Sequence, residues 1–264
     1  MIHDLRTILD GWEYETGKIS VRKIIGQDGR EKVQTRVDLG VIQFEVDGRP
    51  DGVRPFGYES LLESHEARLR KHIRKHRTCD HFTLSPDECF ELRQEAHLYY
   101  QRYLSMFVLE EYDAVERDTA RNLRVLDFCR RYAAEPDDRN ALESQRAYVT
   151  MMNLRARAYR AMAESHFEAA LALIDNGIEH VVALCEQYES EEPAAQRQEV
   201  RVLRALRDEI LDTMPDNAPS KLRWELEMAL AIEDYERAAQ LRNRLATIAP
   251  SQFGSSPTRS ADAD

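Results

Sequence analysis

A short run of histidines and one cysteine has the residue types and the spacing that could bind a metal ion. His72 and His76 are four residues apart and would share one face of a helix, and Cys79 and His81 follow closely. Nitrogen and sulfur ligands of this kind suit zinc. The same stretch is rich in Lys and Arg, however, and their positive charge would repel a cation. We therefore expect no bound metal.

The positive charge around these histidines could itself bind phosphates. Residues 68–77 carry six Lys and Arg in a chain whose formal net charge is -11, so nucleic-acid binding would be confined to this segment. The candidate contacts are Arg70, Lys71, Arg74 and Lys75. Leu69, Ile73 and His76 fall at helical spacing, which favours the alternative of a surface helix with one buried stripe and a solvated basic face.

The sequence lacks the common catalytic motifs. It contains no Gly-rich phosphate loop, no Gly-x-Ser-x-Gly elbow and no His-Glu-x-x-His pair. Because the chain has 48 Asp and Glu residues, pairs of carboxylates on its helices are expected by chance. We therefore predict that the protein is not an enzyme and needs no cofactor.

Composition and cysteine usage predict a soluble, cytoplasmic protein. Of the 264 residues, 42% are hydrophobic and 32% are charged, which suits a helix-rich chain with a charged surface. The amino terminus lacks a signal sequence, and the four cysteines include no Cys-x-x-Cys pair, so reduced thiols are expected. The apolar runs are much shorter than the roughly 20 residues that cross a bilayer. No membrane partner is expected.

The first 57 residues contain eight of the ten glycines and read as a turn-rich β unit. Two β-prone runs, residues 18–25 and 31–39, flank Asp28-Gly29, which is a typical hairpin turn. The apolar alternation resumes after Gly40, which we interpret as a bulge. A hairpin is marginal alone, so this one should pack on the following helices or on Trp12 and Tyr14.

Prolines divide the chain from residue 59 onward into long segments that suit helices. Ser85 followed by Pro86 predicts a helix start, because the serine side chain caps the first amides and proline at that position loses no hydrogen bond. Ser220, directly after Pro219, predicts the equivalent start for the last pair of helices. A helical body over residues 58–215 would precede that pair.

Three places in the helical region share a pattern in which an aromatic residue is followed by an acid and then by a small or β-branched residue. The aromatics are Tyr112, Phe167 and Tyr235. Each would begin the second helix of a helical hairpin, where the acid stabilises the first turn and the small residue allows close helix packing. The aromatics are 55 and 68 positions apart, so we expect stacked hairpins rather than a regular solenoid.

The middle hairpin resembles a tetratricopeptide repeat. The residues that carry this likeness are Leu154, Ala158 and Ala161 on the first helix and Phe167, Ala170, Ile174 and Gly177 on the second. Ordinary αα-hairpins of one bundle are the alternative. Both interpretations give a helical core.

The last hairpin has the most ordered pattern, over residues 222–245. It comprises Leu226 and Ala229 on the first helix, acid-acid-aromatic-Glu at 233–236, the Ala238-Ala239 pair, and Leu241-Arg242. This segment resembles the UVR motif, the helical hairpin of the excision-repair proteins UvrB and UvrC. It departs from that family at Asn243, where an Asp usually follows the arginine.

Helical spacing supports the same hairpin without the family. Apolar stripes run along Leu222, Leu226, Ala229 and Leu230 on the first helix and along Ala238, Leu241, Leu245 and Ile248 on the second. Two short helices cannot bury both stripes and the Trp224 ring against each other. The surplus apolar surface must therefore meet the rest of the chain or another protein.

In UvrB and UvrC the motif joins the two proteins, and similar motifs occur in bacterial stress and protease-adaptor proteins. The resemblance implies an adaptor linked to DNA repair or stress response, whose partner is a protein with a UVR-type hairpin or a second copy of this chain. The implied partner-binding residues are Leu226, Ala229, Tyr235, Ala238 and Ala239 for packing, and Glu236 and Arg242 for charge. The alternatives are a hairpin that only caps the helical bundle, and a nucleic-acid-associated factor that uses residues 68–77.

The sequence thus predicts a mainly α protein of stacked, tetratricopeptide-like helical hairpins. The expected divisions are a β-hairpin unit at 1–57, the helical body at 58–215, the UVR-like hairpin at 219–248 and a disordered tail at 249–264.

Overall fold

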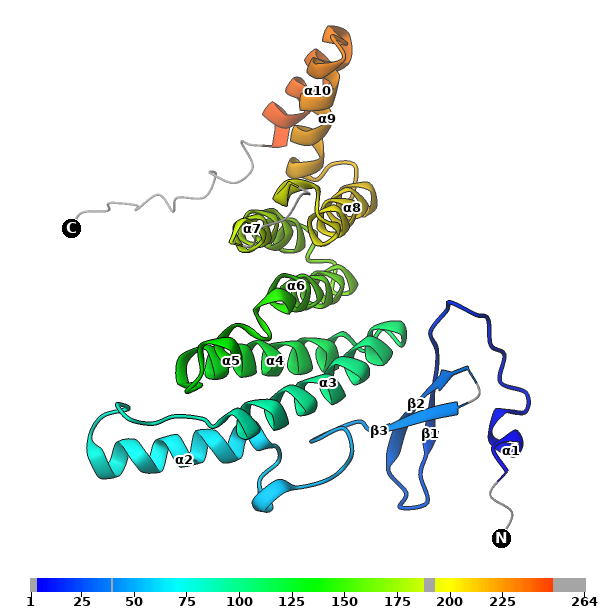
Figure 1. Cartoon of the computed structure of the whole chain (residues 1–264). Coiled ribbons are helices and arrows are strands. Elements are labelled where there is room, and N and C mark those ends of the chain that lie inside the picture. Colours follow the sequence, from blue (N-terminus) through cyan, green and yellow to red (C-terminus); the bar gives the residue numbers. More distant parts are fainter. Residues whose placement is uncertain (1–3, 39, 188–192, 249–264) are drawn as a thin grey trace, which may run out of the picture.

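The computed structural model describes residues 4–38, 40–187 and 193–248, and the expected tail at 249–264 lies outside them. The chain is mainly helical, as predicted, with a small antiparallel sheet near its amino terminus (Figure 1). The elements are α1 (Arg6–Leu9), β1 (Ser20–Ile25), β2 (Glu31–Val37), β3 (Gly40–Glu45), η1 (Pro55–Gly57), α2 (Leu61–His76), α3 (Pro86–Val108), α4 (Tyr112–Tyr132), α5 (Pro136–Asn140), η2 (Glu143–Gln145), α6 (Arg146–Ala163), α7 (Phe167–Glu186), η3 (Ala194–Gln196), α8 (Gln198–Thr213), α9 (Pro219–Ala231) and α10 (Tyr235–Ile248). In the parts of the chain that the structure describes, no helix is both long enough and apolar enough to cross a membrane.

The sheet has three strands in the order β1-β2-β3, one more than the expected hairpin. The turn between β1 and β2 lies at Asp28-Gly29 as predicted, and Gly29 has a φ of +75°. The bulge predicted at Gly40 is wrong, because Gly40 begins β3 and pairs directly with Val37 of β2. A tight turn with φ of +43° at Asp38 precedes it, and such a turn requires no extra residue in the ladder.

Both expected supports of the sheet are present. The Trp12 indole N–H donates to the Ser20 hydroxyl over 2.7 Å, and the Arg22 guanidinium lies 4.0 Å from the centre of the Trp12 ring. On the helical side, the hydroxyls of Thr35 on β2 and Ser105 on α3 are 2.6 Å apart. The sheet is thereby fixed to the helices as well as to the segment before it.

The helices follow one another from one end of the molecule to the other (Figure 1). The order of packing is α3, α4, α6, α7, α8, and then the pair α9 and α10, with α2 and the sheet beside α3. Gly177 on α7 allows α6 to approach closely, because a Cβ there would lie 2.7 Å from the Leu154 side chain. A main apolar core runs from β2 and α3 to α8, and a second core joins α2, α3 and α4.

Two buried ion pairs join α3 to α4. The guanidinium of Arg102 donates hydrogen bonds of 2.7 and 2.8 Å to the two carboxylate oxygens of Asp118, and both side chains are fully buried. Glu95 pairs with Arg121 and also accepts a 2.8 Å hydrogen bond from the Leu61 backbone N–H at the start of α2. Removing these charges from water costs free energy, so the folded protein tolerates each buried charge only while its ion-pair partner is present.

Arg102 and Arg117 hold the end of the sheet. Arg102 also donates to the Glu45 backbone carbonyl over 2.9 Å. Arg117, directly before Asp118 on α4, donates to the Val46 carbonyl over 2.8 Å and to the Asp47 carboxylate over 2.9 Å. The charged face between α3 and α4 thus fixes where β3 ends.

The second helix of each expected hairpin begins at its aromatic residue, namely α4, α7 and α10. All three preceding turns have the same backbone, with a φ near +60° at Glu110, Ser165 and Glu233. In each turn the following N–H reaches back to a carbonyl five residues earlier, over 2.7 to 2.9 Å. This is the Schellman geometry, built here without glycine.

The two serine caps have different outcomes. Ser85 caps the start of α3, as predicted, and it also forms a full capping box with Glu88. The cap predicted at Ser220 is wrong, because α9 begins one residue earlier at Pro219. The Ser220 backbone N–H instead donates to the Glu168 carboxylate of α7 over 3.2 Å. Proline needs no partner in the first helical turn, so the helix starts without a side-chain cap.

Candidate functional site

The α9–α10 hairpin has a small apolar core of its own. Leu222 and Ala229 on α9 and Ala238 and Leu241 on α10 are buried against each other. Leu226, Leu245 and Ile248 pack around them and are half-buried. The hairpin therefore uses its predicted stripes, apart from Leu230, within itself.

The base of the hairpin is attached to the helical body at few points. The Trp224 ring packs against the main core, which accounts for part of the predicted surplus of apolar surface. The Lys221 ammonium donates to the Met214 carbonyl over 2.9 Å and to the Asp216 carboxylate over 3.0 Å, and this interaction lowers the pKa of Asp216. Arg244 of α10 donates to the Asp216 carbonyl over 2.8 Å.

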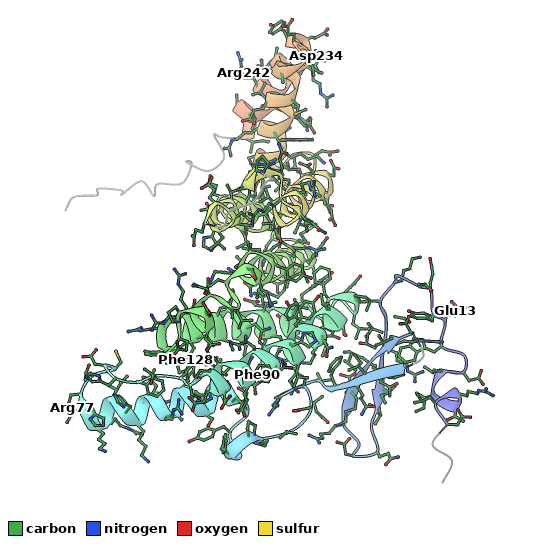
Figure 2. All side chains as sticks on the ribbon, viewed as in Figure 1. Glu13, Arg77, Phe90, Phe128, Asp234 and Arg242 are labelled. Atoms are coloured by element: carbon green, nitrogen blue, oxygen red, sulfur yellow. The ribbon has the colours of Figure 1, made fainter. Side chains whose placement is uncertain are left out.

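The far end of the hairpin exposes large apolar side chains. Ile232 and Tyr235 are 70% and 67% exposed, and Met228 and Leu230 are also exposed. Acidic residues surround them, namely Glu227, Glu233, Asp234 and Glu236. Figure 2 shows Asp234 at the end of the hairpin that points away from the helical stack. We call the four apolar residues, 228, 230, 232 and 235, the tip.

The seven predicted partner-binding residues divide into two groups. Leu226, Ala229 and Ala238 lie inside the hairpin, between its helices. Tyr235, Glu236, Ala239 and Arg242 are exposed on α10. Spacings of four and seven residues place Ala239 and Arg242 on the same face of α10 as Tyr235, so these side chains can contact one partner together.

Sequence reasoning missed two exposed apolar residues of the tip, Met228 and Ile232. Both fall off the apolar stripe of α9, so periodicity alone assigns them no role. Leu230 was placed on that stripe but is 43% exposed. The signal that could have identified all three is the short turn, which leaves nothing to cover side chains at the end of two helices.

The basic segment occupies the second half of α2. Lys71, Arg74 and Lys75 are exposed, and the Arg70 guanidinium lies 3.8 Å from the Glu66 carboxylate. Basic residues in the last turn of a helix interact favourably with its dipole, which gives them a structural role. The predicted buried stripe holds only at Leu69, because Ile73 and His76 are exposed. The reason is that α2 extends beyond the helices that it packs against (Figure 1).

The histidines near this segment interact with each other and with the backbone. A ring nitrogen of His72 is 2.9 Å from the Asp80 carbonyl oxygen, and the His72 and His76 rings are 4.6 Å apart. Within the described ranges, no group of three or more His, Cys, Asp or Glu side chains is placed to hold a metal ion. All four cysteines are free thiols.

Comparison of the chain with models of protein families, with curated proteins and with solved structures found no match.

Proposed function

We propose that the protein is a non-enzymatic protein–protein interaction adaptor that docks a partner through the hairpin at residues 219–248. The observation that supports this most is the tip, where four large apolar side chains are exposed on an element that already has its own core. Exposed apolar clusters with polar rims are typical of binding surfaces. The resemblance to the UVR motif adds the expectation of a role in DNA repair or stress response.

The charges around the tip define the chemistry of the partner. Glu227, Glu233 and Glu236 are exposed beside the apolar side chains and Asp234 is half-buried there, while Arg237 is drawn towards Glu225, 3.5 Å away on the opposite helix. The fitting partner is therefore a protein with an apolar groove bordered by Lys and Arg. In this proposal the body is a tetratricopeptide-like stack that holds the hairpin away from the sheet.

A tip variant tests this proposal. Replacing Ile232 and Tyr235 by serine removes the two most exposed apolar side chains and leaves the buried residues of the hairpin in place. We expect proteins captured from lysate by the natural chain to be lost with Ile232→Ser/Tyr235→Ser. A purified partner should bind the variant more than tenfold more weakly, which corresponds to about 1.4 kcal/mol. Calorimetry gives that affinity.

Phe90→Ser provides the matched control, because Phe90 is 55% exposed on α3, far from the hairpin. It should retain the captured proteins and their affinity. An unchanged set of captured proteins with the tip variant, at an unchanged thermal midpoint, would contradict docking through the hairpin.

A second candidate function is binding of nucleic acid by the basic end of α2, and the exposure of Lys71, Arg74 and Lys75 favours it. Neutralising Arg70, Lys71, Arg74 and Lys75 should then abolish a salt-dependent affinity for single- or double-stranded nucleic acid, measured by fluorescence anisotropy. The control is to neutralise Arg130 and Arg131, which are exposed at the end of α4. Equal affinities for the two variants would exclude this segment as the binding surface.

A further inference from the structure

Two separate ends of the molecule carry opposite charge. Figure 2 shows Arg77 at the free end of α2 and Asp234 at the free end of the α9–α10 hairpin, with the helical stack between them. Residues 70–77, which we call the basic end, contain five Lys and Arg and no acid. The tip is bordered instead by four acids, Glu227, Glu233, Asp234 and Glu236.

Most of these charges have no ion-pair partner in their own molecule. Among the residues that the structure describes, no carboxylate pairs with four of the five cations, namely Lys71, Arg74, Lys75 and Arg77. Within the same ranges, no cation pairs with the three exposed acids of the tip, Glu227, Glu233 and Glu236. Because one exposed ion pair contributes little alone, several have to form together to hold two surfaces in contact, and each end offers several.

Apolar side chains lie among the charges at both ends. Ile73 is 40% exposed on α2, and the rings of His72 and His76 lie beside each other on the same helix. At the tip, Ile232 and Tyr235 are the most exposed apolar side chains. An exposed tyrosine ring also attracts Lys and Arg. Contact between the two ends would therefore cover apolar surface as well as pair charge.

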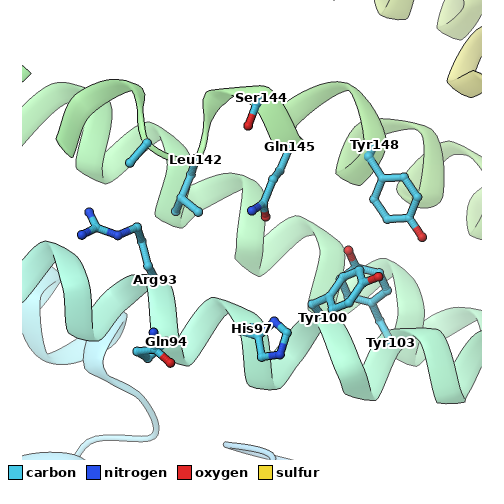
Figure 3. A pocket seen from close by; sticks show the side chains of 10 residues that line it. Arg93, Gln94, His97, Tyr100, Tyr103, Leu142, Ser144, Gln145 and Tyr148 are labelled. Carbon is cyan, nitrogen blue, oxygen red and sulfur yellow. The ribbon is translucent and has the colours of Figure 1, made fainter. Parts of the chain in front are cut away.

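The two ends of one molecule cannot meet. The helices from α3 to α8 lie between them and pack continuously on one another (Figure 1). A pocket of about 690 Å³ opens in this stack between α3 and the segment that leads into α6. Even there Tyr100 and Tyr148 meet across the gap, with ring centres 6.2 Å apart (Figure 3). The tip of one molecule can therefore reach only the basic end of another.

We propose that the tip of one molecule docks on the basic end of a second copy, so that the chain assembles head to tail. This inference rests on the proposed function, because it uses the tip as a docking surface and names a second copy as its partner. Since the two surfaces differ, every docking step leaves one free tip and one free basic end, and the assembly can grow. Both ends are small compared with stable interfaces, which bury about 1,200 to 2,000 Å², so the assembly should be reversible.

Sedimentation velocity of the full chain measures this assembly. We expect the average mass to rise as the protein concentration is raised to about 1 mM. Raising the salt concentration from about 0.1 M to about 1 M shortens the Debye length from about 10 Å to about 3 Å. It should therefore weaken the association, because the attraction between the two ends is largely electrostatic.

Two variants each disable one end. Ile232→Ser/Tyr235→Ser removes apolar surface from the tip, and Lys71→Glu/Lys75→Glu reverses two exposed charges of the basic end. Each should self-associate more than tenfold more weakly than the natural chain. The matched control is Arg6→Glu/Arg54→Glu, which reverses two exposed charges outside both ends and should associate as the natural chain does.

A mixture of the two variants distinguishes head-to-tail assembly from pairing of like ends. The charge-reversed variant keeps its natural tip, and the serine variant keeps its natural basic end, so one can dock on the other. Their remaining ends are both disabled, and we therefore expect a 1:1 complex and nothing larger. If tips paired with tips, the charge-reversed variant would associate as the natural chain does, and that result would overturn the proposal.

Two further results would overturn it. One is a natural chain that stays monomeric up to about 1 mM, whether or not its basic end binds nucleic acid. The other is a mixture of the two variants that forms no complex. The proposed function is tested separately, because capture of other proteins requires the tip and not the basic end. Lys71→Glu/Lys75→Glu should therefore still capture the proteins that the natural chain captures from lysate.

Discussion

The two ends of the helical stack are attached to it in opposite ways. At the sheet end, fully buried Arg102 links Asp118 of α4 to the backbone at Glu45, so charge is placed inside the protein. At the other end, the α9–α10 hairpin rests on the half-buried Trp224 ring and on hydrogen bonds made by Ser220, Lys221 and Arg244 near the surface. One junction is a buried ionic network, and the other is a small contact between two separate cores.

The two junctions are suited to different roles. A buried ion pair tolerates little movement, because displacing either partner leaves an unpaired charge inside the protein. The sheet and the first helices should therefore unfold together. An element with few contacts to its neighbour opens more easily than the rest, and binding surfaces are commonly found on such elements. The hairpin with its exposed tip fits this second description.

The largest effect should come from breaking the buried pair. Arg102→Ala leaves the Asp118 carboxylate buried with only Arg117 beside it, so we expect the free energy of unfolding to fall by about 3 to 5 kcal/mol. Urea denaturation measures this change. The control, Arg117→Ala, removes a 3.1 Å contact to the same carboxylate from a side chain that is 42% exposed, and should cost less than about 1 kcal/mol. Equal losses would mean that burial does not set the strength of this junction.

The next effect should be local to the hairpin. Leu241→Ala removes a buried side chain from its small core, and such changes cost about 2 to 5 kcal/mol. We expect amide hydrogen exchange to lose protection throughout α9 and α10 while α3 and α4 keep theirs. Leu126→Ala in the second core is the counterpart and should lower protection across the body. A loss of protection in α3 and α4 with Leu241→Ala would show that the two ends unfold as one unit.

Glycine at the positive-φ position of a turn between two helices should stabilise the body and the hairpin independently. Glu110 and Glu233 have positive φ, which strains any residue with a Cβ, so Glu110→Gly and Glu233→Gly should each add up to about 1 kcal/mol. We expect Glu110→Gly to raise the thermal midpoint of the body, and Glu233→Gly to raise amide protection in the hairpin alone. Glu164→Gly, at an ordinary φ of -85°, is the control. A higher thermal midpoint for Glu164→Gly would show that relief of a positive φ is not what stabilises the other two variants.

The smallest effect should be a pH dependence confined to the body. Burial lowers the pKa of His65 on α2 below its ordinary value of 6.5, with Arg68 adding to this effect and Glu88 opposing it. Below about pH 6.5 the unfolded chain takes up a proton that folded His65 resists, so its contribution to stability is complete above that pH and is lost as the pH falls.

The matching variant is His65→Gln. Urea denaturation at about pH 7.5 and pH 5.5 should show a smaller loss of stability on acidification for the variant than for the natural chain. The hairpin contains no histidine, so amide protection in α9 and α10 should change little between the two pH values. The same loss in both chains would exclude His65 as the cause.

Local signals in the sequence predicted much of this fold. The Ser85 cap, the turn at Asp28-Gly29 and the helix starts at the three aromatics each depend on a few neighbouring residues, so their patterns could be recognised without tertiary contacts. Gly40 and Ser220 were misjudged because strand pairing and the Glu168 carboxylate, both non-local, decide what those residues do.

The sites were harder to predict than the helices. Periodicity treats charged residues as surface, so it could not place Arg102 and Asp118 in the interior. It also could not bring Tyr148 opposite Tyr100, which depends on the path of the chain between α4 and α6. The role of the UVR-like residues in binding a partner stays a prediction.

The Trp224 ring joins the α9–α10 hairpin to the main core. Each layer of the stack packs mainly on the layers next to it, so removing the last pair would uncover the part of the main core on which Trp224 packs. A hairpin from another protein, fitted with a tryptophan and a lysine at the same places, could be grafted onto it, which would make this end of the chain a modular connector.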